Sequence, residues 1–331
     1  MINKVAMIPI VGRPNVGKST LTNVLTGDKV SIVTPKPQTT RNRIFGVFTY
    51  DSTQIVLLDT PGFHKARTRL GDYMVGVVKE SVADVDAVAM MVEPVDNIGA
   101  QEDLLLTHIE RSGIPAVLVI NKIDRIRFEH TLPIIEKYSK RFAFDAIVPV
   151  SAKNGDGIPQ LLQVFESFAT EGQQLFPDGM TTDQPEKQII AEIIREKLLL
   201  CLEREIPHGT AVEITKFSER VPGASDREAP QTGDASLTDD APLTDDASLT
   251  DDASFIENAP LIDVDATIYC EKESHKGMII GKNGVMLKRI GQLAREDIER
   301  FMGARVFLQT WVKVKVNWRD SQTMIRNFGY T

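Results

Sequence analysis

The stretch that decides the fold is GRPNVGKS, residues 12–19, which directly follows the apolar residues 5–11. It fits the pattern G-x-x-x-x-G-K-[ST], in which glycines let backbone N–H groups turn toward phosphate oxygens. A helix is predicted to begin at about residue 19, and its positive end favours an anion. The pattern therefore predicts a phosphate-binding loop made of Gly12, Arg13, Pro14, Asn15, Val16, Gly17, Lys18, Ser19 and Thr20.

Two stretches supply the predicted catalytic and metal groups. Lys18 is placed to reach the β- and γ-phosphates of a nucleotide, and the Ser19 hydroxyl is placed to ligate Mg²⁺. Asp59 ends the apolar residues 55–58 and can hold the Mg²⁺ shell through water, while the Gly62 N–H can meet the γ-phosphate. The second stretch of the nucleotide site is therefore Asp59, Thr60, Pro61, Gly62 and Phe63.

A guanine-reading sequence follows the apolar residues 116–120. The Asp124 carboxylate can accept hydrogen bonds from N1–H and the 2-amino group of guanine, a donor pair that adenine lacks. Asn121 can donate to the purine, and the Lys122 stem can cover the ring. A backbone N–H in Ser151, Ala152 and Lys153, after residues 147–150, can contact the guanine carbonyl. These residues predict GTP as the ligand, in place of ATP.

The loop QTTR, residues 38–41, is predicted to close over Mg²⁺ and the γ-phosphate, although a plain polar loop is the alternative. We favour Thr40 over Thr39 as the metal ligand and count it with Lys18, Asp59 and Gly62 as catalytic. Phe63 stands where Ras-like proteins carry a water-orienting Gln. The Asn15 amide oxygen could ligate a monovalent cation, K⁺, that replaces an arginine finger.

The first half of the chain alternates short apolar runs with helical patterns, which predicts an α/β fold with an open, mostly parallel sheet and helices on both faces. Strands are expected at residues 5–11, 55–58, 87–92, 116–120 and 147–150, and helices at 19–25, 102–111, 132–142 and 158–168. Pro9 conflicts with a central strand because it cannot donate a ladder hydrogen bond. We expect a bulge or an unusual pairing there.

The 331 residues are enough for about two domains. We assign residues 1–172 to a GTPase domain, 173–186 to a linker, and 187–331 to a smaller α+β domain with an acidic insert at about 222–261. Residues 224–265 hold twelve acids and one base, including repeats of ASLTDD, and we expect a disordered loop. Residues 269–331 hold twelve bases and six acids, so this basic part points to an anionic partner.

The motifs GRPNVGKSTLTNVL, PQTTRNRI, DTPGFH and NKID are similar in sequence and spacing to those of the Era family of GTPases. That family follows its GTPase domain with a type II KH domain. Here MIIGKNG, residues 278–284, matches the GxxG turn that brings backbone close to nucleic-acid phosphates. The expected RNA-binding residues are Ile279 and Ile280 as an apolar floor for bases, with Gly281, Lys282, Asn283, Gly284, Lys288 and Arg289.

The resemblance implies binding to single-stranded RNA at the 3′ end of 16S ribosomal RNA and a role in small-subunit assembly. It also implies a cytoplasmic location with some peripheral membrane association, and we expect a monomer. No apolar run reaches the roughly 18 residues that a membrane-spanning helix needs. Two alternatives stay open: a GTPase acting on another RNA such as tRNA, and a regulatory GTP switch whose second domain binds protein.

Overall fold

The computed structural model describes residues 2–37, 39–63, 68–82, 85–203, 209–220, 243–244 and 260–330. The chain forms two compact units. The first comprises Met1–Gln184 together with Tyr330–Thr331, and the second comprises Pro185–Gly329. Each unit has its own hydrophobic core, so each is described by itself.

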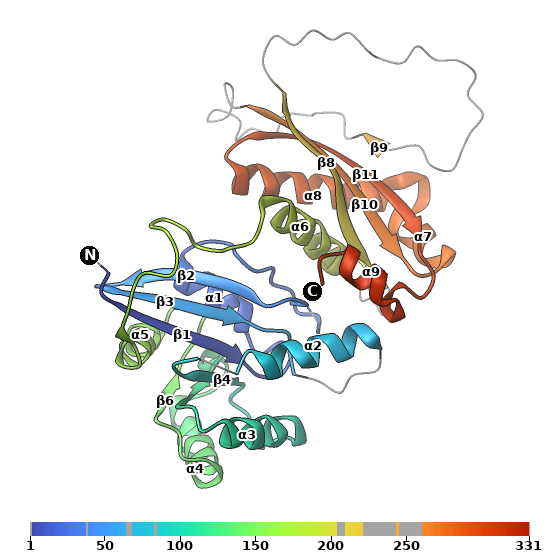
Figure 1. The fold of residues 1–331 in the computed structure, drawn as a ribbon. Coiled ribbons are helices and arrows are strands. Elements are labelled where there is room, and N and C mark those ends of the chain that lie inside the picture. The colour runs from blue at the N-terminus through green and yellow to red at the C-terminus, as the bar shows by residue number, and fades with distance from the viewer. Residues whose placement is uncertain are drawn as a thin grey trace, which may run out of the picture. The chain divides into compact units, whose positions relative to one another are not determined.

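The first unit is an α/β sandwich around one mixed sheet (Figure 1). Its strands lie in the order β2-β3-β1-β4-β5-β6, with β7 paired to β1. Strands β1, β3, β4, β5 and β6 are parallel, whereas β2 runs antiparallel to β3. The elements are β1 (Lys4–Val11), α1 (Lys18–Thr26), β2 (Ile44–Tyr50), β3 (Thr53–Asp59), α2 (Arg69–Glu80), β4 (Val88–Val92), α3 (Ala100–Ser112), β5 (Ala116–Ile120), α4 (Thr131–Arg141), β6 (Ala146–Pro149), α5 (Ile158–Ser167) and β7 (Thr170–Glu171).

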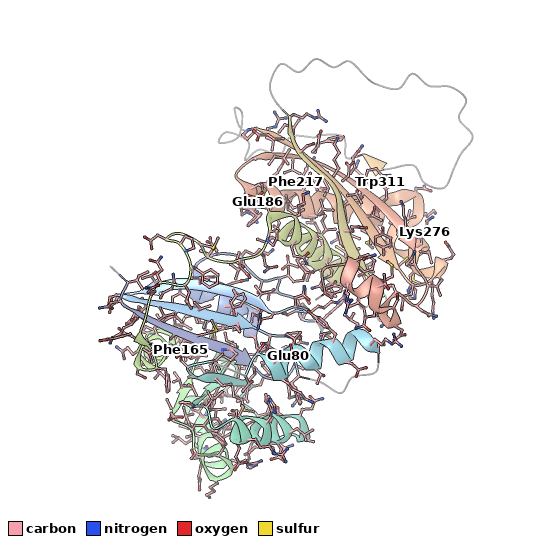
Figure 2. All side chains as sticks on the ribbon, viewed as in Figure 1. Glu80, Phe165, Glu186, Phe217, Lys276 and Trp311 are labelled. Carbon is pink, nitrogen blue, oxygen red and sulfur yellow. The ribbon has the colours of Figure 1, made fainter. Side chains whose placement is uncertain are left out.

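Helices cover both faces of this sheet, as the sequence predicts. Leu21 of α1 and Phe165 of α5 (labelled in Figure 2) pack in one core cluster with Ile8 of β1. Val78 of α2 belongs to a second cluster, formed with α3, α4 and the alternate residues of β4 and β5. Burial on both faces explains why the sequences of β4 and β5 are continuously apolar. The predicted fold class is therefore confirmed.

The proline in the first strand is accommodated without the expected bulge on the β3 side. Pro9 lies opposite Leu58 in an unbroken parallel register. On the other side, β1 pairs with β4 only from Ile10 onward. Further back along β1, the backbone N–H of Met7 donates to the Asp86 side chain at 2.7 Å. A side chain thus replaces a ladder bond next to the residue that cannot donate one.

The second unit is a small α+β domain in which three helices pack on one sheet (Figure 1). The sheet order is β8-β10-β11-β9, and β10 is parallel to β11. Alternate residues of β10, such as Val264 and Ile268, join Ile194 of α6 and Ile290 of α8 in the core. The elements are α6 (Glu186–Cys201), β8 (Ala211–Arg220), β9 (Leu243–Thr244), β10 (Leu261–Cys270), α7 (Glu273–Ile280), α8 (Val285–Met302), β11 (Arg305–Val314) and α9 (Gln322–Asn327).

The acidic insert falls between β8 and β10, and most of it lies outside the described residues. The expectation that it is disordered concerns those residues. Of the repeat, only Leu243–Thr244 is described, as β9, which pairs antiparallel with Thr310 and Gln309 of β11. The core elements follow the order α6-β8-β10-α7-α8-β11, that is α-β-β-α-α-β.

Candidate nucleotide site and nucleic-acid loop

The carboxyl ends of the parallel strands meet at one edge of the first unit's sheet, where ligands bind in open α/β folds. A cavity of about 570 Å³ lies there. Its walls come from the loops that follow β1, α1, β3, β4 and β5, and include Asn15, Lys18, Ser19, Thr40, Gly62 and Lys122. Pro14, Gly17 and Thr20 from the phosphate-binding loop also line it. The cavity brings together residues that lie more than 100 positions apart in the sequence.

The phosphate-binding loop leads directly into α1. Gly17 caps the helix with φ of 106° and, being glycine, brings no side chain to occupy the first N–H groups. A Cβ there would lie 2.3 Å from the Asn121 amide nitrogen, so the position excludes other residues. Those N–H groups and the helix dipole are therefore available to an anion.

Two residues of the phosphate-binding loop are fixed by the rest of the first unit. Arg13 donates to Glu102 of α3 at 3.0 Å, and the Val16 side chain is buried in the first core cluster.

Lys18 is almost fully buried and donates to the carbonyl oxygens of Gly12, at 3.3 Å, and Arg13, at 3.0 Å. Burial lowers the pKa of Lys18 to about 8, although the nearby Asp59 carboxylate opposes this shift. Below that pH the ammonium is charged and carries the positive charge that phosphate oxygens need.

The pKa of Lys18 predicts a pH dependence of GTP binding. Above pH 8 the free protein loses the Lys18 proton, whereas bound phosphates stabilise the ammonium, so binding must take a proton up. We expect the association constant to fall about tenfold per pH unit above pH 8. Fluorescence titration of a labelled GTP analogue from pH 7 to 9.5 measures this. The Lys18→Arg variant stays charged over this pH range, so its association constant for GTP should not show the decrease above pH 8 that deprotonation of Lys18 causes. An identical slope in both proteins would contradict the assignment.

Three oxygen-bearing side chains converge beside Lys18. The Ser19 and Thr40 hydroxyls are 2.8 Å apart, and Thr40 donates to Asp59 Oδ2 at 3.4 Å. Among the described residues, the buried Oδ1 of Asp59 has no hydrogen-bond partner. A buried carboxylate oxygen without a partner is costly unless a cation completes it. Two hydroxyls and a carboxylate are a donor set that suits Mg²⁺.

The structure distinguishes the two candidate threonines. Thr39 donates to the Lys36 carbonyl oxygen at 2.7 Å and contacts the Thr34 hydroxyl at 2.8 Å. Its hydroxyl is thus engaged within its own loop, whereas that of Thr40 faces Ser19 and Asp59. Thr40 as a metal ligand stays a prediction, and the Thr40 hydroxyl lies beside the other two predicted metal ligands.

The residues predicted to read guanine lie in the loops after β5 and β6, beside Lys122 and Arg125 of the cavity wall. The Asn121 amide donates to the Val16 carbonyl at 2.8 Å and accepts from the Ala152 N–H at 3.0 Å, so it ties three loops together. Ser151 donates to Asp124 Oδ1 at 2.7 Å, and this bond is the main cause of the lowered pKa of Asp124. The exposed carboxylate is therefore ionised at neutral pH and accepts hydrogen bonds only. Lys153 is exposed at the rim.

Lys122 connects the two ends of the cavity. Its ammonium donates to the Asn15 carbonyl at 2.5 Å and pairs with Glu93, which follows β4. Sequence reasoning missed Glu93. The signal was present, because β4 is a parallel strand whose carboxyl end must lie at the same edge as the phosphate-binding loop.

The described residues directly after β3, Thr60 to Phe63, place backbone near the phosphate-binding loop. The Phe63 N–H donates to the Gly12 carbonyl at 2.9 Å, while its half-buried ring packs against the second core cluster. Thr60 donates to the Ile10 carbonyl at 2.7 Å and, like Pro61, is buried. Gly62 approaches Pro14 so closely that a Cβ would lie 2.6 Å from it. Among the described residues 60–63, the backbone is therefore the part that can serve a phosphate.

In the second unit, GKNG forms the turn between α7 and α8, in which Lys282 and Asn283 are exposed and Gly284 is buried. Gly281 has φ of 76° and ψ of 176°, and a Cβ there would lie 2.7 Å from Met286 Cβ. Asn283 and Gly284 also have left-handed φ, and Gly284 caps α8. The turn and the start of α8 carry three exposed basic residues, Lys282, Lys288 and Arg289. A fourth, the half-buried Lys276, lies on α7 (labelled in Figure 2).

The apolar residues beside this turn differ from the expected ones. Ile279 has 0% exposure and belongs to the core of the second unit, and Ile280 packs partly against the same core. The side chains of Met278 and Val285 are exposed instead, by 49% and 68%. Since α7 turns Ile279 inward, we correct its assignment from base contact to support of the turn.

Comparisons with known proteins match both parts of the chain. Residues 7–122 match the family described as 50S ribosome-binding GTPase, and residues 249–319 match the KH domain. GTPase Era of Ruminiclostridium cellulolyticum is 44% identical over 330 residues, which cover 100% of this chain and 98% of that protein. The chain belongs to the GTPase Era family. GTPase Era of Clostridioides difficile is 43% identical, with 99% of this chain and 98% of that protein covered.

Two solved Era structures share the fold of this Era-family chain. One is Era in complex with MgGDPNP and nucleotides 1506–1542 of 16S ribosomal RNA, with TM-score 0.85, 33% identity and 99% coverage of both chains. The other is a variant of Aquifex aeolicus Era bound to GDP.AlF4⁻, with TM-score 0.84, 34% identity and 99% coverage of both. The chain is therefore a GTPase with a KH domain. Within its described parts, no helix is long and apolar enough to cross a membrane.

Proposed function

We propose that this Era-family chain binds GTP with Mg²⁺ at the carboxyl edge of its first sheet. Ser19, Thr40 and Asp59 would hold the metal, and the unpartnered buried oxygen of Asp59 supports this most directly. When bound, Mg²⁺ would supply positive charge that neutralises negative charge developing on the phosphates. Lys18 would neutralise the same phosphates, and the Gly62 N–H would donate to the γ-phosphate. Asp124 would select guanine.

The proposed domains are a GTPase domain at residues 1–172, a connecting segment at 173–186 and the KH domain at 187–331. Residues 173–184 pack on the first unit: the Phe176 ring lies 5.8 Å from that of Phe45, and the Val47 N–H donates to Thr181 at 2.8 Å. The boundary between the compact units falls between Gln184 and Pro185.

We propose that a K⁺ ion assists hydrolysis, since Phe63 has no group that could orient water. The Asn15 amide nitrogen donates to the Pro35 carbonyl at 2.8 Å, an orientation in which the amide oxygen remains for a cation. The ion would take the place of an arginine finger by stabilising negative charge on the phosphates. The position of Asn15 on the cavity wall supports this assignment.

Exchange of K⁺ for Na⁺ should lower GTP turnover at least about tenfold, because a preorganised positive charge would be lost from the reacting phosphates. Phosphate release measured at equal ionic strength gives the ratio. Asn15→Ala should be slow in both salts. Equal turnover of the unaltered protein in K⁺ and Na⁺ would contradict the proposal.

We further propose that the KH domain binds single-stranded RNA at the 3′ end of 16S ribosomal RNA, and that the protein acts in small-subunit assembly. The GKNG turn carries this proposal, because Lys282 and Asn283 are exposed, a GxxG backbone can approach phosphates closely, and basic side chains flank it. The RNA in the solved Era complex supports the identity of the target. Such a partner implies a cytoplasmic location, with peripheral membrane association as a further proposal.

Sequencing the RNA that co-purifies with the full chain after crosslinking in cells tests the target. Fragments from the 3′ end of the small-subunit RNA should be enriched over total RNA. Enrichment of tRNA would favour the alternative of another RNA substrate. No enriched RNA would favour a switch whose second domain binds protein.

A further inference from the structure

The residue after Thr40 has an unexpected partner at the end of the chain. Arg41 is only 2% exposed, and its Nη1 donates to the Tyr330 hydroxyl at 2.9 Å. The guanidinium carbon also lies 5.6 Å from the centre of the Tyr330 ring. Tyr330 is 4% exposed and clusters with the first unit. A buried guanidinium is stable only where its donors and charge are matched, as this hydroxyl and ring do in part.

The next residue of the loop is also held. The Tyr73 hydroxyl of α2 donates to Asn42 Oδ1 at 2.9 Å. Tyr73 and Tyr330 lie near each other: burial mainly, and then Tyr330, raise the pKa of Tyr73 to about 12. The Tyr73 phenol is thus a neutral donor at physiological pH. Three consecutive residues consequently face three different supports, with Thr40 toward Ser19 and Asp59, Arg41 toward Tyr330, and Asn42 toward Tyr73.

We propose that Tyr330 is a positioning residue for the GTP-bound state: by holding Arg41, it keeps the Thr40 hydroxyl facing Ser19 and Asp59. Neighbouring Cα atoms are only about 3.8 Å apart, so an Arg41 side chain held in place limits the backbone movements by which Thr40 could turn away from Ser19 and Asp59. This inference rests on the proposed metal site. Tyr330 touches neither nucleotide nor metal and acts through Arg41.

The distinctive consequence is a change in nucleotide preference. Closure of a loop threonine depends on the γ-phosphate and Mg²⁺, so it contributes to binding of GTP and not of GDP. Removing Tyr330 should therefore weaken a non-hydrolysable GTP analogue about tenfold and leave GDP affinity unchanged. A purely structural role of Tyr330 would weaken both nucleotides alike.

Two truncations of the full chain isolate this residue. One lacks only Thr331, and the other lacks Tyr330 and Thr331. Affinities for the GTP analogue and for GDP, each with Mg²⁺, give a ratio that should fall only in the second. Tyr330→Phe keeps the ring and loses the hydroxyl, so its ratio should lie between those of the unaltered protein and Tyr330→Ala. In the Arg41→Ala background, Tyr330→Ala should change the ratio no further.

An unchanged ratio in Tyr330→Ala would overturn the proposal, as would additive effects of Arg41→Ala and Tyr330→Ala. Thr40→Ala separates this proposal from the metal site on which it rests. If Thr40→Ala lowers the ratio and Tyr330→Ala does not, only the role of Tyr330 fails. If Thr40→Ala leaves the ratio unchanged, the proposed metal site itself fails.

Discussion

Asp124→Asn should lower the affinity for GTP by about 100- to 10,000-fold and create affinity for xanthosine triphosphate. The carboxylate would accept hydrogen bonds from N1–H and the 2-amino group of guanine, and each charge-assisted bond contributes about 1.5–3 kcal/mol. The asparagine amide would instead place a donor opposite the 2-amino group. Xanthine carries a carbonyl at that position, which the new donor matches.

Competition between GTP and xanthosine triphosphate for a labelled nucleotide measures this exchange. Asp28→Asn is the matched control, since Asp28 is an exposed carboxylate of the same unit that follows α1 and lies outside the residues predicted to read guanine. It should leave both affinities unchanged. Retention of GTP affinity by Asp124→Asn would show that another group reads the base.

Replacement of both glycines of the GKNG turn by aspartate should weaken RNA binding at least about 100-fold and leave GTP turnover within about twofold. Gly281 has φ of 76°, and its Cβ would meet Met286. Gly284 caps α8 with φ of 77°. The substitution thus disturbs the turn and sets two negative charges where RNA phosphates must approach. A 100-fold loss of RNA affinity corresponds to about 2.8 kcal/mol of binding free energy, because 1.4 kcal/mol changes affinity tenfold.

Two further variants separate loss of recognition from loss of folding. Gly291→Asp adds a charge within α8 at a position where a Cβ meets nothing within 4 Å, so it should bind RNA nearly normally. Lys282→Ala with Lys288→Ala leaves the turn intact and should reduce the salt dependence of binding by about two charges. Unchanged RNA affinity in the double-aspartate variant, with the domain folded, would remove the turn from the binding site.

Much of the fold could be predicted because local patterns and global topology agree. The buried strands β4 and β5 are continuously apolar, and the phosphate-binding loop fixes a strand before it and a helix after it. By contrast, β2 and α2 were missed. Strand β2 contains Gly46, and α2 contains Gly71 and Gly76, which lower strand and helix propensity. The helix forms because Leu70, Met74 and Val78 share a buried face.

The nucleotide site was predictable in its motifs and not in its supports. Asp124 and Lys18 stand at fixed positions in short sequence patterns that physical chemistry can interpret. Glu93 and the partner of Arg41 lie in no such pattern. Arg41 and Tyr330 are 289 residues apart, and nothing local in either sequence indicates the other. Ile279 was misassigned because a helix adjoining a turn presents one of two neighbouring isoleucines to the core, and spacing alone does not say which.

The most direct test of the proposed function is to locate the RNA on the protein. The full chain, loaded with a GTP analogue and Mg²⁺, is photo-crosslinked to an RNA that ends in the 3′ sequence of 16S ribosomal RNA, and the linked peptides are identified by mass spectrometry. We expect crosslinks in the segment from Lys276 to Arg289, with competition by excess unlabelled RNA of the same sequence and not by tRNA. Crosslinks confined to other segments, or lost equally to tRNA, would contradict the assignment of the KH turn and of its target.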